Sequence, residues 1–330
     1  IQNFNHLKIH SQYSICEGAI KIDALKDFSK EKKLKSIGIC DTGNLCGALE
    51  FAEKISKVGT QPIIGTQINF KYGDTVGQLP LYALNEKGYK RIIELSSLSY
   101  LKNDELSDPH LDLSELFIKH EGVSIFSGTI SGLFGRLFDK GKFNEIVELY
   151  TKLKENFNNR FYLEIQRHGD QNELNFEKFN LSKSLEIDIP LIATNEVFYL
   201  EKEMHEAHDA LICIKNKTYV NEKQRERFSD QHYFKSNSEM QQLFNDLPEA
   251  LENNYNFPLR CCFRPLFSSP ILPNISSEKG GNAEETIKSE SIEGLKEKFK
   301  KIFKIEKEQL LSDEKYLKYK DRLDHELAII

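Results

Sequence analysis

Short apolar segments alternate with longer amphipathic segments along most of the chain. The short segments have the length and apolar content of buried strands and lie at residues 7–11, 36–40, 62–70, 79–84, 123–127, 161–166 and 191–194. The longer segments repeat apolar residues every three to four positions, as helices do, at residues 21–34, 49–55, 89–101, 113–119, 133–139, 143–157, 174–186 and 201–214. Repeated strand–helix units predict an α/β fold with a parallel sheet, and their number favours closure into a barrel.

The alternation weakens beyond residue 216. The charged segment 217–227 is predicted to be an exposed, mobile loop. Ser236 and Glu239 have the spacing of a capping box and precede a short helical pattern of apolar residues.

A domain boundary is indicated by Pro265, Pro270, Pro273 and the polar segment 276–282. Beyond it, residues 284–304 and 315–330 are predicted to form charged amphipathic helices with solvated polar faces. We expect a main domain over residues 1–270, a linker over 271–286, and over 287–330 the start of a larger helical region. The last helical pattern lacks a C-cap, which favours its continuation.

Composition excludes several classes of protein. A length of 330 residues suffices for one large core and a small second unit, and a net charge of -6 argues against a strongly basic nucleic-acid clamp. The chain has no long apolar run and no signal-peptide pattern, so we expect a cytoplasmic protein. Without a Cys-x-x-Cys pair, buried reduced thiols are expected for Cys16, Cys40, Cys46, Cys213, Cys261 and Cys262.

Polar side chains gather where the predicted strands end. They are His10, Asp41, Thr42, Gln67, Arg167, His168, Asn195 and Glu196. In a barrel of parallel strands these ends share one mouth, where active sites are built from several strands. Each residue alone has an ordinary structural interpretation, such as turn chemistry for Asp41, and only their joint placement predicts a present or former site.

Two other patterns are weak. His205 and His208 lie three residues apart on one predicted helix, but the apolar residues after them favour ordinary helix packing over a metal site. The segment 127–132 contains two glycines without the Gly-Lys-Ser/Thr ending of a nucleotide P-loop.

Longer motifs carry a resemblance to a known family. They are Phe4-Asn5-His6-Leu7-Lys8-Ile9-His10-Ser11-Gln12-Tyr13-Ser14-Ile15-Cys16-Glu17-Gly18-Ala19, Asp41-Thr42-Gly43-Asn44-Leu45-Cys46-Gly47-Ala48-Leu49-Glu50-Phe51, Pro62-Ile63-Ile64-Gly65, Glu164-Ile165-Gln166-Arg167-His168-Gly169, Ala193-Thr194-Asn195 and Arg322-Leu323-Asp324-His325-Glu326-Leu327. Together, and in this order, they resemble the start of the alpha subunits of bacterial DNA polymerase III, the replicative C-family polymerases. The resemblance covers essentially the whole chain.

The resemblance implies a fold, a set of domain bounds and the position of the polymerase active site. Residues 1–270 would form a polymerase-and-histidinol-phosphatase (PHP) domain, a distorted (β/α)7 barrel, and residues 287–330 would begin the palm and thumb region of the polymerase. The catalytic aspartates of the palm lie further along in that family. We therefore expect this chain to be inactive by itself, although the parent protein resembles a DNA-directed DNA polymerase.

The resemblance also implies which metal-ligand positions of the PHP domain remain. His10, Glu17 and Asp41 retain a ligand, and Glu196 stands at the first position of a late Asp-x-His motif whose histidine position holds Phe198. The vestigial site expected from motifs and strand ends comprises Lys8, His10, Glu17, Asp41, Thr42, Gln67, His168 and Glu196.

Other ligand positions have lost their ligand. Lys8 and Thr42 replace histidines, Gln67 replaces a glutamate, Gln78 stands where a histidine is expected, and Thr129 stands where the polymerases usually have cysteine. Metal ligands bind as deprotonated donors, whereas Lys8 carries a positive charge. We therefore expect no metal in this site.

Lys8 is instead expected to neutralise the remaining carboxylates, chiefly Glu17, Asp41 and Glu196. The resulting hypothesis is a structural domain that docks a separate proofreading exonuclease subunit, within a holoenzyme that acts on primer–template DNA. The parent polymerase would use Mg²⁺. The alternative is a metal-dependent phosphoesterase or 3′-5′ proofreading exonuclease acting at the barrel mouth.

Overall fold

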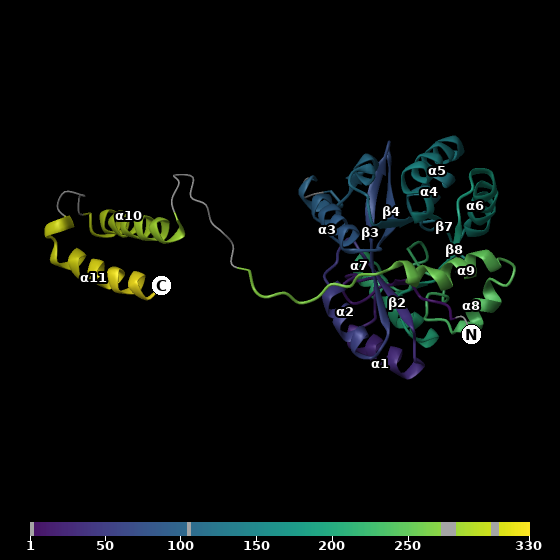
Figure 1. Cartoon of the computed structure of the whole chain (residues 1–330), viewed down its shortest axis with the longest axis horizontal. Helices are drawn as coiled ribbons and strands as arrows, with labels where there is room; N and C mark the ends of the chain where they lie inside the picture. The colour runs from purple at the N-terminus through teal and green to yellow at the C-terminus, as the bar shows by residue number, and fades with distance from the viewer. Residues whose placement is uncertain (1–2, 104–106, 272–281, 305–309) are drawn as a thin grey trace. The chain divides into compact units, whose positions relative to one another are not determined.

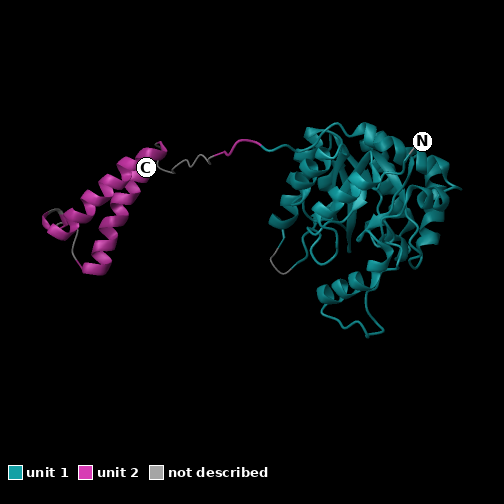
Figure 2. Cartoon of the chain, turned by 90° about the horizontal axis from the view of Figure 1, so that it is seen from below, with its two compact units in different colours: residues 1–267 teal, residues 268–330 magenta. Residues whose placement is uncertain are grey.

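The computed structural model describes residues 3–103, 107–271, 282–304 and 310–330. The chain divides into two compact units, Ile1–Phe267 and Ser268–Ile330 (Figure 2). The first unit is a mixed α/β fold in which helices surround a curled sheet (Figure 1). This architecture agrees with the α/β class predicted from the alternating pattern.

One sheet holds the strands of the first unit. In the described residues these are β1 (Lys8–Ile9), β2 (Ser36–Thr42), β3 (Gln61–Tyr72), β4 (Thr75–Ala83), β5 (Leu111–Asp112), β6 (Val123–Phe126), β7 (Phe161–Ile165), β8 (Leu191–Ala193) and β9 (Glu196–Val197). Their hydrogen-bonded order is β8-β7-β6-β4-β3-β2-β1-β9, with β5 paired to β3 beside this path.

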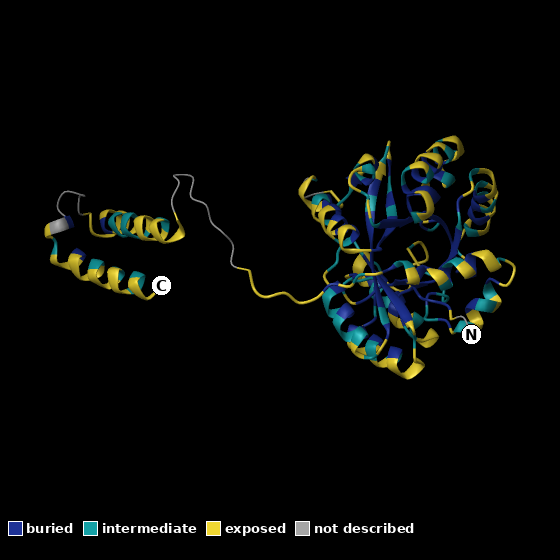
Figure 3. Cartoon of the chain, viewed as in Figure 1, coloured by how far each residue is buried: buried dark blue, intermediate teal, exposed yellow. Residues whose placement is uncertain are grey.

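Helices cover the outside of the sheet. They are α1 (Ile22–Lys32), α2 (Ala48–Lys57), α3 (Glu86–Leu101), α4 (Leu133–Asp139), α5 (Phe143–Phe157), α6 (Glu173–Ile187), α7 (His205–Asn216), α8 (Asn237–Leu243) and α9 (Pro248–Asn256). Short 3₁₀ helices lie at Leu113–Phe117, Asn158–Arg160, Lys202–Met204 and Phe257–Arg260. Figure 3 shows buried strands and helices whose outer faces are exposed, the distribution that the amphipathic pattern predicted.

The two ends of the strand order are joined by the chain itself. Only Thr194 and Asn195 separate β8, which pairs with β7, from β9, which pairs with β1. A buried apolar cluster takes side chains from β2, β3, β4, β6, β7 and β8 and from the residue before β1: Cys40, Ile63, Tyr82, Phe126, Tyr162, Ile192 and Leu7. The sheet therefore curls around a filled interior, as a barrel does.

An asparagine side chain bridges the seam near β8. The Asn254 amide donates to the carbonyl oxygens of Ala193 at 3.0 Å and Asn5 at 2.9 Å, and its oxygen accepts from the Asn5 amide at 2.8 Å. The neighbouring Asn253 donates to Leu191 O at 2.7 Å. Side-chain amides thus satisfy backbone groups that a regular strand ladder would otherwise pair.

The prediction of an entirely parallel sheet was wrong at β4. This strand is antiparallel to both neighbours, β3 and β6. Tyr72 pairs with Thr75, so only Gly73 and Asp74 connect β3 to β4. A connection this short can form only a hairpin, because a parallel neighbour requires a crossover of a dozen or more residues. The antiparallel strand is the main distortion of the barrel.

Several predicted elements differ in extent. The first strand is only Lys8–Ile9 instead of 7–11, and the helix predicted at 113–119 is the 3₁₀ helix Leu113–Phe117. The strand predicted to end at Thr194 stops at Ala193 and resumes as β9. Glu196 therefore lies within a strand instead of after one.

Two predictions beyond residue 216 have clear outcomes. The capping box is confirmed, because the Ser236 hydroxyl accepts from the Glu239 amide while the Glu239 carboxylate accepts from the Ser236 amide. The segment 217–227 is mostly exposed, but Arg225 anchors it with two hydrogen bonds of 2.6 Å to the carboxylate of Asp209 in α7.

The second unit consists of α10 (Ala283–Phe303), the 3₁₀ helix Leu310–Ser312 and α11 (Glu314–Ile329). Phe299, Leu310 and Tyr316 form its small apolar core. Both predicted helices therefore exist close to their expected bounds, and α10 begins inside the segment 271–286 that was expected to be a linker.

Cysteine burial follows local structure. Cys40, Cys213 and Cys261 are buried and Cys16 is half-buried, whereas Cys46 and Cys262 are exposed. The expectation of buried thiols was wrong for these last two, which lie in a turn before α2 and in irregular chain after Arg260. Among the described helices, none has the length and hydrophobicity that a membrane span requires.

Candidate functional site

Four of the strand-end residues meet at one mouth of the barrel. They are His10 after β1, Asp41 in β2, Gln67 in β3 and Glu196 in β9, and all are buried. Gln67 Nε2 donates to Glu196 Oε1 at 2.9 Å, and His10 Nε2 lies 2.8 Å from the same oxygen. Since a carboxylate can only accept, the histidine donates in this contact.

Lys8 is buried inside the barrel between two carboxylates. Its Nζ lies 3.5 Å from Glu164 Oε1 and 3.9 Å from Glu196 Oε1. Within the described residues the ammonium has no partner at hydrogen-bond geometry. Burial by itself lowers the pKa of Lys8, but the charges of Glu164 and Glu196 outweigh burial and raise this pKa. The lysine is therefore a buried cation held mainly by charge.

The opposing carboxylate is stabilised in its ionised form. Burial raises the pKa of the Glu196 carboxyl, but the Lys8 ammonium and the hydrogen bond from His10 hold this pKa well below its usual range. Glu164 is also engaged, since its Oε1 accepts from Gln166 Nε2 at 3.0 Å and from the Thr194 hydroxyl. Lys8 thus faces two carboxylates within one hydrogen-bonded network.

Asp41 has partners other than Lys8. Its Oδ1 accepts from the Ser11 amide at 2.7 Å and the Ser14 hydroxyl at 2.7 Å, and its Oδ2 accepts from the Ser11 hydroxyl at 2.8 Å. Burial raises the pKa of the Asp41 carboxyl, and the serine hydrogen bonds oppose that rise. The structure therefore corrects the expectation that Lys8 neutralises Asp41.

Glu17 lies at the rim of the mouth. It accepts from the Thr42 hydroxyl at 2.6 Å and pairs with the ammonium of Lys215 in α7. The expectation that Lys8 neutralises Glu17 is therefore also corrected. Glu17, Thr42 and Lys215 line a cavity of about 410 Å³ together with Gln78 and Arg136.

The remaining positions of the expected metal site hold no ligand. The Thr129 hydroxyl lies 2.9 Å from the Ser131 hydroxyl. The Phe198 ring packs 4.7 Å from the His10 ring and 5.1 Å from the His208 ring, centroid to centroid.

The barrel mouth does not fit a divalent cation. The Glu196 Oε1 lone pairs face His10, Gln67 and Lys8, and the Asp41 oxygens face serine donors. A cation would have to displace these donors while lying next to the buried positive charge of Lys8. The chemistry of the donor set therefore argues against a divalent cation among Lys8, His10, Asp41, Gln67 and Glu196.

Three candidate residues belong to other parts of the fold. Arg167 forms ion pairs with Glu177 in α6 at 2.6 Å and with Asp246 at 2.7 Å, so it connects α6 to the turn between α8 and α9. His205 Nε2 lies 3.0 Å from Phe228 O and His208 Nε2 lies 2.8 Å from Glu17 O. These contacts agree with the packing interpretation of both histidines.

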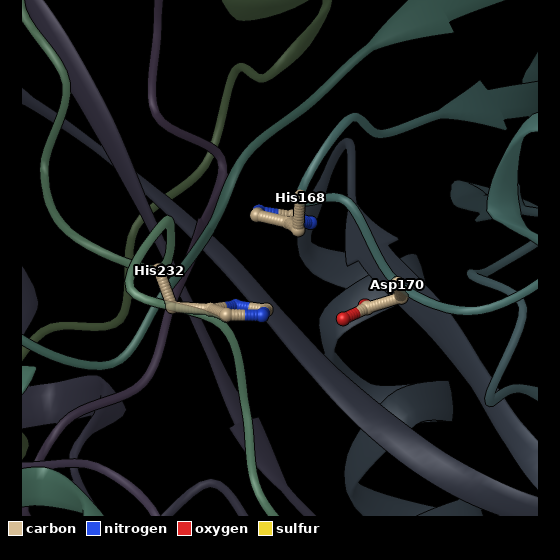
Figure 4. Close-up of side chains that lie close together, drawn as sticks. All are labelled: His168, Asp170 and His232. Atoms are coloured by element: carbon tan, nitrogen blue, oxygen red, sulfur yellow. The ribbon is translucent and has the colours of Figure 1, made fainter.

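A second cluster lies beside the mouth and includes His168. His168, Asp170 and His232 offer ligand atoms within 4.8 Å of one another (Figure 4). The His168 and His232 rings are stacked, with centroids 4.0 Å apart and planes inclined by 8°. Burial, followed by the charge of His168, holds the pKa of His232 well below its usual range, and burial raises the pKa of Asp170.

Sequence reasoning missed Glu164, Asp170 and His232. Glu164 left one usable signal, because a carboxylate inside the apolar strand Phe161–Ile165 requires a buried cation. The sequence held no signal for His232, because this residue lies in irregular chain between α7 and α8. Only the folded chain brings its ring next to the backbone of Glu196.

The sequence is similar to known proteins over its whole length. The PHP domain family matches residues 6–168. The chain is 36% identical over 337 residues to the DNA polymerase III subunit alpha of Caulobacter vibrioides, covering 100% of this chain and 29% of that protein. The subunit alpha of Rickettsia conorii is 38% identical over 334 residues, covering 99% of this chain and 28% of that protein. The chain thus spans less than a third of these relatives.

A solved structure gives a weaker likeness. It is a two-domain protein of Bacteroides vulgatus, described as containing a predicted PHP-like metal-dependent phosphoesterase. The alignment has a TM-score of 0.35 and 12% identity, and it covers 72% of this chain and 62% of the other.

Proposed function

The chain belongs to the family of DNA polymerase III alpha subunits and contains a PHP domain homologous to their N-terminal region, and from this premise we propose that its barrel is a non-catalytic scaffold. The observation that carries the proposal is Lys8, a buried cation 3.5 Å from Glu164 and 3.9 Å from Glu196. A lysine supplies the positive charge that these carboxylates need, but it offers no lone pair that could activate water at neutral pH.

The proposed scaffold serves a larger protein. Residues 1–270 would be the PHP domain, with a linker over 271–286, and residues 287–330 would begin the polymerase region, of which α11 is a part. The whole protein would extend primer–template DNA by phosphoryl transfer with Mg²⁺ in its palm, outside this chain. Other holoenzyme subunits would bind it, a proofreading exonuclease subunit would dock on or near the barrel, and the assembly would be cytoplasmic.

The catalytic side of this proposal is tested by a hydrolysis assay. The chelator-stripped chain is incubated separately with Mn²⁺, Zn²⁺ and Mg²⁺ and supplied with bis(p-nitrophenyl) phosphate or single-stranded DNA. The expected rate equals that of the His10→Ala variant under each condition. Metal-dependent hydrolysis that disappears in His10→Ala would overturn the scaffold and favour the phosphoesterase or exonuclease alternative.

The docking side requires a separate experiment. The chain is mixed with the purified exonuclease subunit and analysed by size-exclusion chromatography with light scattering. Co-elution at equal stoichiometry is expected. Independent elution at about 10 µM, a concentration at which a complex with a Kd of about 1 µM is mostly formed, would contradict docking on this chain.

A further inference from the structure

His232 has a buried nitrogen without a partner. Its side chain is 2% exposed, and within the described residues Nε2 has no hydrogen bond. Nδ1 lies 3.1 Å from the carbonyl oxygen of Glu196, which can only accept. The proton of the neutral ring is therefore on Nδ1, and Nε2 presents a lone pair. An unsatisfied lone pair in a buried position requires an explanation.

His168 is also held through one ring nitrogen, which in this residue is Nε2. Asn195 Nδ2 donates to Tyr233 O at 2.9 Å, which directs Asn195 Oδ1 toward His168 Nε2 at 3.0 Å. Lys235 also donates to Oδ1, at 3.3 Å. The Glu196 amide approaches the same ring nitrogen at a longer 3.3 Å, so the Asn195 contact decides that Nε2 carries the proton. His168 Nδ1 then presents a lone pair.

Both histidines thus have one ring nitrogen fixed by an oxygen acceptor. The other nitrogen has no hydrogen bond in His232, within the described residues, and faces the Glu173 carboxylate at 3.7 Å in His168. Metal-ligating histidines typically show this arrangement, because the outer hydrogen bond fixes the tautomer and the ring orientation. Figure 4 shows the His232 ring extending from its backbone toward the Asp170 carboxylate. A half-buried carboxylate next to two imidazoles completes a three-ligand set.

We propose that His168, Asp170 and His232 form a binding site for a divalent transition-metal ion of the zinc class. Two imidazoles and one carboxylate suit Zn²⁺ better than Mg²⁺ or Ca²⁺, which prefer oxygen ligands. Glu173 adds negative charge nearby, since its Oε1 lies 3.7 Å from His168 Nδ1. The site shares no ligand with the carboxylates around Lys8, although both histidines contact the backbone of Glu196.

Binding requires a small local contraction. Ligand atoms around a tetrahedral zinc lie about 3.3 Å apart, since Zn–N distances are near 2.0 Å. The present atoms lie within 4.8 Å, and the two rings are stacked. One ring must tilt out of the stack so that both lone pairs point at the same ion.

The test uses the 330-residue chain after chelator treatment. Zn²⁺ is titrated by calorimetry, and Co²⁺ is titrated by its visible absorption, which reports nitrogen and oxygen coordination. One ion per chain is expected. Asp170→Asn and His232→Gln should each weaken binding at least about tenfold, the scale on which metal-site residues act. His325→Gln, at an exposed histidine of the second unit, should leave binding unchanged.

Three results would overturn the site: no stoichiometric binding, equal binding by both ligand variants, or loss of binding in His10→Gln but not in Asp170→Asn. The last result would place the ion at the barrel mouth. Circular dichroism confirms that each variant is folded, and Asp170→Asn preserves the shape of a half-buried side chain. Hydrolysis by the zinc-loaded chain would contradict the scaffold without contradicting the site, so the two proposals fail separately.

Discussion

A lysine inside a barrel is stable as a cation only when carboxylates surround it, and Lys8 has two such neighbours. It is fully buried, and Glu164 Oε1 and Glu196 Oε1 lie within 3.9 Å of its Nζ. The lysine and the carboxylates therefore depend on each other. Removing one side of such an arrangement leaves uncompensated charge in a medium that solvates it poorly.

Lys8→Met should lower the free energy of unfolding by about 3 to 5 kcal/mol, because Glu164 and Glu196 lose their buried cation. Urea denaturation followed by circular dichroism measures the change. Adding Glu164→Gln to Lys8→Met should recover part of the loss, since it removes one of the unpaired charges.

The matched control is Lys57→Met, at an exposed lysine whose partner is Glu53 on the same helix. Its effect should stay within about 0.5 kcal/mol. If Lys8→Met were as mild as this control, the buried charges would not stabilise the barrel.

The sequence predicted the location of a site residue only where its position relative to a strand determines that location. His10 follows β1 and Asp41 lies near the end of β2, so the pattern of strands placed them at one mouth. Gln67 lies in the middle of β3 and Glu196 begins β9, so their arrival at the same mouth depends on the register of the sheet. The partners of each charge depend on side-chain geometry across strands far apart in sequence. The spacing of residues along the chain therefore could not predict the pairing of Lys8 with Glu164, which lies far from it in sequence.

At the scale of elements, Arg225 connects a charged loop to a helix. Its guanidinium donates two hydrogen bonds to Asp209 in α7 and a third to Val220 O at 3.1 Å. Such a fork fixes a loop more firmly than a single charge contact does. The segment 217–227 is consequently held against α7 although most of its residues are exposed.

Arg225→Ala should make this loop more susceptible to trypsin, which cleaves after Lys217 and Lys223. Cleavage should accelerate several-fold, because it follows the population of the open loop. Limited proteolysis with mass spectrometry of the fragments gives the rates. Arg227→Ala is the control, since the Arg227 side chain is 60% exposed and lies 3.8 Å from Asp209. Equal rates in the wild type and Arg225→Ala would show that the clamp does not order the loop.

Element prediction succeeded where amphipathic periodicity was strong and failed where connections decide direction. The helices α5 and α10 lie close to their predicted bounds, since each pattern spans several turns. The direction of β4 was missed, because apolar content is the same in parallel and antiparallel strands. Only the tight turn at Gly73 and Asp74 determines it.

At the scale of the whole molecule, buried neutral histidines link folding to pH. His6 is fully buried, and burial lowers its pKa to about 3 despite the hydrogen bond to Lys235 O. The native state keeps this ring neutral, whereas the unfolded chain protonates it below about pH 6.5. The unfolded state therefore binds more protons, and stability falls as pH decreases from 6.5 toward the folded pKa.

His6→Gln should reduce this dependence. Between about pH 7.5 and 5, its free energy of unfolding should fall by about 2 kcal/mol less than that of the wild type, since one proton uptake is removed. Chemical denaturation at several pH values measures both slopes. His325→Gln should retain the wild-type slope, and the idea is wrong if His6→Gln retains it too.

The seam at Thr194 and Asn195 also bears on solubility. A strand with a free edge can recruit a second chain and start an aggregate. Here the strands at the ends of the order, Leu191–Ala193 and Glu196–Val197, are very short, and Asn253 and Asn254 already occupy carbonyl groups of the former. The barrel thus offers little template for intermolecular sheet growth, so a crowded cell should tolerate it at high concentration without edge-to-edge association.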